Sequence, residues 1–146
     1  MTLPFIITQV IQKVQINDEL LIQKEMEWAT AHRIAVYLEE YFPGWNIDCE
    51  YNKVGIGINS KHDSTGSHKR PDIVIHKREL IEKENNLLVI EIKMKSGDIS
   101  DEQKLVDFTS MPNDKRPFQY QFGLKISFLP QLILKWYQNG HEVKNI

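Results

Sequence analysis

Apolar residues recur at helical spacing along the first part of the chain. In FIITQVIQKV (residues 5–14) they return every three or four positions, which predicts a short amphipathic helix. A longer helix should follow, because Asn17 or Asp18 can cap its first turn. This helix should run to about Phe42, just before a Pro-Gly pair that would end it.

The spacing then changes to that of strands. Four stretches are expected to be strands: NIDCEYNKVGIGI (residues 46–58), RPDIVIH (70–76), LLVIEIKMK (87–95) and FQYQFGLKISFL (118–129). A helix should begin at Ser100, because Ser100 and Gln103 have the spacing of a capping box. Residues 131–143 contain an Asn-Gly pair and should form either a closing hairpin or a strand with a frayed tail.

The expected order is helix, strand, strand, strand, helix, strand, with an additional N-terminal helix and a C-terminal strand or hairpin. This order predicts an α/β (α+β) fold with a mixed central sheet. Residues 59–69 lack periodicity and are rich in Ser, Gly and charge, so we expect an exposed loop there. A chain of 146 residues, 41% of them hydrophobic, can bury one core, which predicts a single domain over residues 1–146.

Charge and cysteine content exclude several classes of protein. The formal net charge of -2 argues against a strongly basic nucleic-acid binder, although residues 1–50 carry 3 Lys/Arg against 8 Asp/Glu and residues 51–146 carry 15 against 12. The single cysteine, Cys49, excludes an internal disulfide and a zinc cluster, and its apolar context predicts a small buried side chain. Because neither a signal peptide nor a membrane span is recognisable, we expect a cytoplasmic protein with no membrane partner.

Glu91 and Lys93 stand near the end of the third predicted strand, after a run of apolar residues. Successive strand side chains alternate between faces, so Glu91 and Lys93 share one face while Ile92 points to the other. Asp72 opens the second predicted strand and would lie beside Glu91 if the two strands pair antiparallel as neighbours. Glu27 lies on the apolar stripe of the long helix and could reach the same place.

Such a group of side chains indicates a metal site. Carboxylates that meet in a partly buried site repel one another, which costs on the order of several kcal/mol unless a cation neutralises them. Oxygen ligands without His or Cys suit Mg²⁺ or Mn²⁺. A lysine beside such an ion can position a water molecule and offset charge that builds on a phosphate. The simpler alternative is an exposed Glu91–Lys93 ion pair, worth at most about 1 kcal/mol.

The segments RPDIVIH and LLVIEIK resemble the PD-(D/E)xK nuclease superfamily, in which Pro71-Asp72 would be the first half of the motif and Glu91-Ile92-Lys93 the second. The superfamily core has the order helix, strand, strand, strand, helix, strand, and the resemblance covers about residues 18–128. It implies a restriction-endonuclease-like core. More closely, the chain looks like a group of small stand-alone bacterial or phage members of this superfamily.

The resemblance implies a role for each matching residue. Asp72 and Glu91 would be ligands of Mg²⁺ or Mn²⁺, together with the backbone carbonyl of Ile92, and Lys93 would orient or activate the attacking water. Glu27 would supply the helix glutamate that completes the metal site in many members. Glu25 is a weaker candidate than Glu27, because it lies about 200° away around the helix.

Other basic residues would contact the substrate in such a nuclease. We expect Lys69, Arg70 and Lys95, which lie close to the motif in sequence, to bind nucleic acid. The helix after the third strand often contributes a polar residue to DNA or to the site in this superfamily, and Lys104 is the matching position. A nuclease of this size would need a homodimer or an accessory subunit to choose its target.

Two functions from different classes remain open. The first is a Mg²⁺-dependent nuclease that hydrolyses phosphodiester bonds, with DNA as the expected substrate. The second is a non-catalytic module that keeps the nuclease fold and binds nucleic acid or a partner protein in a defence or phage system. Trp28, Trp45 and Trp136 are expected in the core or an interface rather than as base-stacking platforms.

Overall fold

A single six-stranded sheet forms the centre of the computed structural model, which describes residues 1–51, 70–97 and 99–146. The strands lie in the order β1-β2-β3-β4-β5-β6, and every neighbouring pair is antiparallel except β3 and β4, which are parallel. Their bounds are β1 Asn46–Cys49, β2 Ile73–His76, β3 Asn86–Lys95, β4 Phe122–Leu129, β5 Ile133–Gln138 and β6 His141–Val143. The mixed α/β class predicted from the sequence is confirmed.

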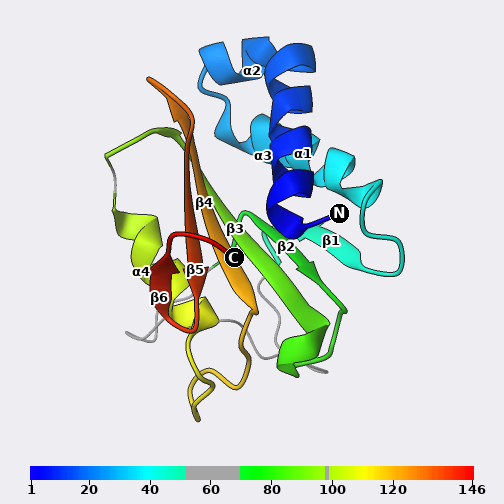
Figure 1. The fold of residues 1–146 in the computed structure, drawn as a ribbon, viewed down its shortest axis with the longest axis vertical. Helices are drawn as coiled ribbons and strands as arrows, with labels where there is room; N and C mark the ends of the chain where they lie inside the picture. Colours follow the sequence, from blue (N-terminus) through cyan, green and yellow to red (C-terminus); the bar gives the residue numbers. More distant parts are fainter. Residues whose placement is uncertain (52–69, 98) are drawn as a thin grey trace.

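Helices cover both faces of this sheet (Figure 1). On one face lie α1 (Leu3–Asn17), α2 (Glu19–Gln23) and α3 (Glu27–Glu39). On the other lies α4 (Ser100–Thr109), which connects the parallel strands β3 and β4. Parallel neighbours require such a crossover because the end of the first strand and the start of the second lie at opposite edges of the sheet. A short 3₁₀ helix, η1 (Lys83–Asn85), precedes β3.

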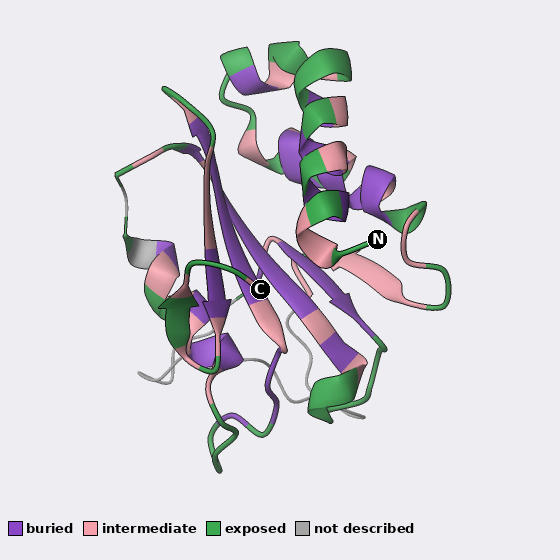
Figure 2. Ribbon diagram, in the orientation of Figure 1, coloured by how far each residue is buried: buried purple, intermediate pink, exposed green. Residues whose placement is uncertain are grey.

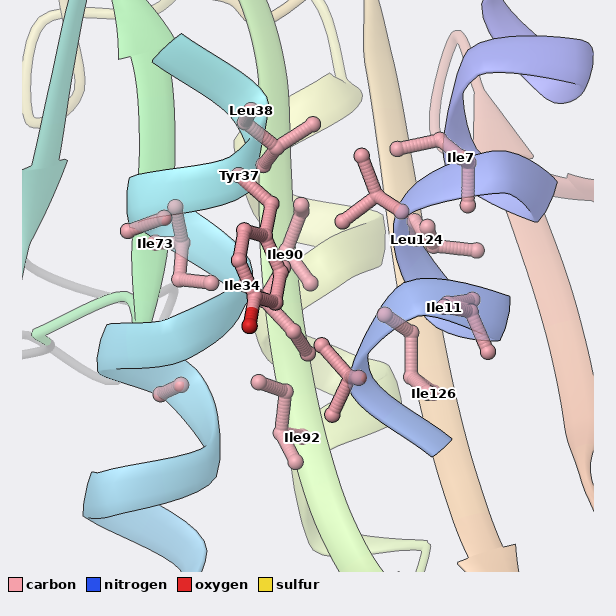
Figure 3. Close-up of a cluster of buried hydrophobic side chains, with 14 of the residues drawn as sticks. Ile7, Ile11, Ile34, Tyr37, Leu38, Ile73, Ile90, Ile92, Leu124 and Ile126 are labelled. Carbon is pink, nitrogen blue, oxygen red and sulfur yellow. The ribbon is translucent and has the colours of Figure 1, made fainter. Parts of the chain in front are cut away.

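The face under α1 and α3 is packed with aliphatic side chains, as Figure 3 shows. Ile34 of α3 and Ile11 of α1 meet Ile90 and Ile92 of β3, all of them buried. These two strand residues are two positions apart, as the alternation of side chains predicted. At about 25 cal/mol per Å² of apolar surface removed from water, this cluster is the main source of stability.

A smaller apolar cluster lies on the opposite face, under α4. Val74 of β2 and Val89 of β3 pack there against Leu105 and Phe108 of α4 and against Tyr120. Buried residues run through the middle strands, while the outer surfaces of the helices are exposed (Figure 2). The second cluster occupies only part of its face, and charged residues occupy the rest.

The long helix predicted from residue 17 or 18 to about Phe42 is wrong in its first part. The chain forms α2 and α3 instead, separated by a turn in which Glu25 has a φ of 53°. Backbone bonds from Lys24 N to Leu20 O and from Met26 N to Leu21 O close α2 before α3 begins. The spacing of apolar residues indicates which positions face the core. It does not indicate whether one unbroken helix connects them.

Two other boundaries differ from the sequence prediction. Residues 118–121 were expected in the fourth strand, but β4 begins at Phe122. The preceding segment bonds to the end of α4 instead: Tyr120 N donates to Phe108 O, and the Arg116 side chain donates to the carbonyl of Ser110, the C-cap of α4. The Arg116 side chain also donates to the carbonyl of Phe118. The expected capping box is also wrong: Ile99 occupies the N-cap position of α4, with no side-chain cap.

Individual side chains also correct the sequence analysis. Cys49, expected to be buried, is exposed because it ends the edge strand β1. Trp28 was expected in the core or an interface; it is 74% exposed, which excludes the core, whereas Trp45 and Trp136 pack against the core as predicted. The predicted strand from residue 52 to 58, with the loop at 59–69, lies outside the described residues.

The closing hairpin is confirmed. Strands β5 and β6 pair with Gln138 opposite His141, and the two turn residues between them, Asn139 and Gly140, both have positive φ. This is the backbone that an Asn-Gly hairpin turn requires. Within the described residues, no helix combines the length and the apolar character needed to cross a membrane.

Candidate active site at the ends of β2 and β3

The pairing of β2 with β3 brings Asp72 beside Glu91. These strands are antiparallel with Ile73 opposite Ile90, so the residue before Ile73 lies next to the residue after Ile90. Asp72 Oδ2 accepts a hydrogen bond from the backbone N–H of Ile92 at 2.7 Å, which fixes the carboxyl at the strand end. The predicted antiparallel pairing of these strands is therefore confirmed, and it places two carboxyl groups together.

Glu91 is the most deeply buried acid of the site, with 1% of its surface exposed. Lys104 of α4 donates from Nζ to Glu91 Oε2 at 3.2 Å. The other oxygen, Oε1, is buried and accepts no hydrogen bond from the described residues. A buried oxygen of this kind is costly, so it should take a proton, shared with Asp72, or a cation.

The first turn of α4 adds a network of charges above Glu91 and Lys93. Asp101 Oδ1 lies 3.3 Å from Lys104 Nζ, and Asp101 Oδ2 lies 3.4 Å from Lys93 Nζ. The spacing of three residues between Asp101 and Lys104 puts both on the same face of the helix. Asp101 therefore bridges the two lysines, and one of them contacts the buried glutamate.

Sequence reasoning identified Lys104 at this helix but missed Asp101. The sequence does show that Asp101 and Lys104 are three residues apart at the start of the helix that follows β3. This signal becomes specific only when the crossover geometry shows that the same helix face lies over Glu91.

Burial and mutual repulsion disfavour the charged forms of the two carboxyls. Burial, and after it the neighbouring Asp72, raises the pKa of Glu91 well above its ordinary value. Burial also raises the pKa of Asp72, against the opposing effect of the hydrogen bond from Ile92. Burial lowers the pKa of Lys104, but the carboxylates of Glu91 and Asp101 raise it more, and the net shift is upward. A positive charge is therefore retained beside Glu91.

Glu27 lies at the edge of the same site. It is the first residue of α3 and is half-buried. Burial raises its pKa, the charge of Asp72 adds to this effect, and Lys93 opposes it. The charges of Asp72 and Lys93 thus influence the Glu27 carboxyl. Glu25, the weaker candidate, lies 3.3 Å from Lys95 instead.

The basic residues expected to bind nucleic acid take different positions. Arg70 and Lys95 are exposed, as a role in binding requires. The Lys104 side chain is only 17% exposed and faces Glu91. Its position fits a contact with the carboxyl site rather than with nucleic acid at the surface. Lys69 lies outside the described residues.

Asp72 also lines a pocket of about 190 Å³. The pocket lies between α3, which contributes Trp28 and His32, and the end of β1, which contributes Cys49 together with the next residue, Glu50. A ligand in this pocket would reach Asp72 from the side of α3. The exposed Trp28 belongs to this pocket, a position that its sequence context did not indicate.

Within residues 1–51, 70–97 and 99–146, no three His, Cys, Asp or Glu side chains form a group arranged to hold a metal ion. The donor set near Asp72 nevertheless fits a hard divalent cation in its chemistry, because two adjacent carboxyls include a buried oxygen that lacks a partner within the same residues. Comparison of the chain with protein-family models, curated proteins and solved structures found no match.

Proposed function

We propose that this protein is a metal-dependent nuclease of the PD-(D/E)xK type, which hydrolyses phosphodiester bonds in DNA. The observation that carries the proposal is the convergence of Asp72 and Glu91 at one strand end, with Lys93 on the same face as Glu91. The order of helices and strands around them is also the order expected of a restriction-endonuclease-like core.

Asp72 and Glu91 would hold Mg²⁺ or Mn²⁺ through their carboxyl oxygens. The backbone carbonyl of Ile92 is a further candidate ligand: a strand residue directs its N–H and C=O to the same side, and the N–H of Ile92 points to Asp72. A bound divalent ion would lower the pKa of a coordinated water and neutralise charge on the phosphate. Glu27 would add a ligand through water or after a side-chain rotation.

Lys93 would act on the water or on the phosphate oxygen. Asp101 Oδ2 lies 3.4 Å from its ammonium group. In a partly buried site, a fixed positive charge stabilises the developing charge of a phosphoryl transition state more strongly than it would in water. Lys104 would keep Glu91 in place when no metal ion is bound.

A second candidate function is the non-catalytic module. It is favoured by the ion pair between Lys104 and Glu91, which already gives the buried carboxylate a partner. In that case the charged network would serve only to hold α4 against β3. Such a module would bind nucleic acid or a partner protein without hydrolysing it.

Hydrolysis assays on plasmid DNA, single-stranded DNA and RNA with Mg²⁺ or Mn²⁺ separate these functions. For the nuclease, Asp72→Asn and Glu91→Gln should lower the rate by about 10²–10³-fold or more, as expected when groups that organise transition-state charge are lost. Glu84→Gln is the matched control, because this exposed glutamate lies in η1, and it should retain full activity. Hydrolysis that persists unchanged in the Asp72 and Glu91 variants would refute the nuclease.

Calorimetry with Mn²⁺ gives an independent reading of the same site. The wild type should bind the ion and Glu91→Gln should not. Absence of binding at millimolar Mn²⁺ would favour the module.

A further inference from the structure

The pocket of about 190 Å³ that Asp72 lines is suited to a small ligand. Its other lining residues are Trp28, Ala31, His32, Cys49 and Glu50. Pockets for drug-sized ligands have volumes of about 300–1,000 Å³, so this one has room for a single ring system rather than for a larger molecule. Within the described part of the chain, no lysine or arginine lines it.

Two aromatic side chains line the pocket from the first turns of α3. Trp28 and His32 are four residues apart and Ala31 lies between them in sequence, so the three share one face of the helix. Trp28 and His32 are exposed, whereas Ala31 is buried and belongs to the apolar core. The pocket therefore combines two solvent-accessible rings with an apolar residue of the core.

The end of β1 joins this pocket to the carboxyl site. Cys49 pairs with Ile73, and the backbone N–H of Glu50 donates to the backbone carbonyl of Asp72 at 3.1 Å. The side chain of the same Asp72 accepts from the N–H of Ile92. Asp72 thus belongs both to the pocket and to the proposed metal site. A group in the pocket is one side chain away from the phosphodiester that this site would hold.

The composition of the pocket favours a flat, uncharged group over a phosphate. The carboxyl groups of Glu50 and Asp72 are acceptors only when ionised, so they repel a phosphate but accept hydrogen bonds from N–H groups on the edge of a nucleobase. Aromatic side chains stack on bases, and every base has a face that allows this contact. The part of a nucleic-acid strand that fits the pocket is therefore a base.

We propose that this pocket binds an unpaired nucleobase next to the scissile phosphodiester, with Trp28 as the stacking residue. The inference rests on the proposed function, which supplies the strand and holds its phosphate at Asp72. A base inside a duplex is stacked and paired, so it must leave the helix before it can enter a pocket, at a cost in free energy. The substrate class is therefore nucleic acid that is single-stranded at the point of cleavage.

Phe5 provides a matched control for Trp28. It is an exposed aromatic residue too, but it belongs to α1 and is not among the residues that line the pocket. Trp28→Ala and Phe5→Ala each remove one exposed ring. Surface substitutions of this kind change stability little, so both variants should melt close to the wild-type temperature.

The first test is binding of a short fluorescent DNA, as a single strand and as a duplex, measured by anisotropy without divalent metal so that no bond is broken. Trp28→Ala should weaken single-strand binding by about tenfold, as expected for the loss of one base–aromatic stack, and should change duplex binding little. The slope of log K against log salt should stay the same, because no phosphate contact is lost. Trp28→Phe should retain most of the affinity, and Phe5→Ala all of it.

Cys49 reports directly whether the pocket is occupied. It is the only cysteine of the chain and it is exposed, so its rate of alkylation by a thiol reagent measures access to the pocket. Single-stranded DNA should slow this reaction several-fold. A strand of the same length with abasic sites carries the same phosphates but no bases, and it should leave the rate unchanged.

Four results would each overturn the proposal. They are equal single-strand affinities for Trp28→Ala and Phe5→Ala, a lower salt slope in Trp28→Ala, equal protection of Cys49 by normal and abasic strands, and absence of single-strand binding by the wild type.

These outcomes are separable from failure of the nuclease. Protection of Cys49 that requires bases, together with hydrolysis that persists in Asp72→Asn, would keep the base pocket and refute the reaction. Loss of hydrolysis in Asp72→Asn, with equal protection by normal and abasic strands, would do the opposite.

Discussion

The two faces of the sheet present different chemistry to the helices that cover them. Under α1 and α3, strand β3 contributes Ile90 and Ile92 to a continuous aliphatic core. Under α4, the same strand contributes Glu91 and Lys93, which are the alternate residues. One strand therefore serves stability with one set of side chains and carries a buried charged network with the other.

This difference indicates where function is to be sought. A buried ion pair often contributes little to stability, because desolvation offsets the attraction between the charges. Aliphatic side chains at Glu91 and Lys104 would pack α4 against β3 at lower cost. The proposed function gives the charged network a chemical role instead, and the predictions below test that distinction.

The largest effect on stability is expected on the aliphatic face. Ile34→Ala removes a side chain that is 1% exposed and should lower the free energy of unfolding by about 2–5 kcal/mol. Denaturant unfolding measures this loss. Ile16→Ala is the matched control because Ile16 is 78% exposed, and it should change stability by less than about 0.5 kcal/mol. Neither variant should change the affinity for Mn²⁺. A large change in Mn²⁺ affinity in Ile34→Ala would contradict the view that the aliphatic face acts on stability alone.

On the charged face, Glu91→Gln should stabilise the protein at neutral pH in the absence of metal. The raised pKa of Glu91 means that the folded wild type loses stability as the pH rises from about 4.5 through the folded pKa. Glutamine does not ionise, so the advantage of the variant should be largest at neutral pH and should vanish below about pH 4.

At saturating Mn²⁺ the wild type should become more stable than Glu91→Gln. A ligand at about one hundred times its Kd stabilises the folded state by about 2.7 kcal/mol, and only the wild type should gain this. Melting temperatures with and without Mn²⁺ at several pH values measure both effects. If the variant is less stable than the wild type at neutral pH without metal, the carboxylate is structural.

A smaller effect is expected for Asp101→Asn. This change weakens the contact at 3.4 Å that holds Lys93, so kcat should fall by about tenfold, equivalent to about 1.4 kcal/mol, with KM nearly unchanged. Steady-state kinetics on DNA measure the two constants. The exposed Asp114 provides the control variant Asp114→Asn. A rise in KM alone would mean that Asp101 acts in binding rather than in positioning Lys93.

Much of the fold was accessible from local pattern. The run of apolar residues in β3 and the Asn-Gly turn before β6 predicted their elements, because strand alternation and turn chemistry are local properties. The break at Glu25 and the late start of β4 were missed. They depend on a positive φ in one case and on hydrogen bonds from Tyr120 and the Arg116 side chain to the end of α4 in the other.

Some residues of the candidate site could likewise be predicted from the sequence, and others could not. Asp72, Glu91 and Lys93 were found because their positions relative to two neighbouring strands follow from the sequence, together with a motif resemblance. Asp101 was missed because its contact with Lys93 depends on where a crossover helix lands over the sheet. Trp28 lies at the surface rather than in the core, because burial depends on what the rest of the chain leaves uncovered.

The sequence by itself determined which side chains share a face, since alternation along a strand is fixed by backbone geometry. Only the tertiary structure decided what lies opposite them: α4 over Glu91, and Lys135 beside Lys125. Those contacts join residues far apart in the chain. Their energies depend on burial and distance, which no local pattern encodes.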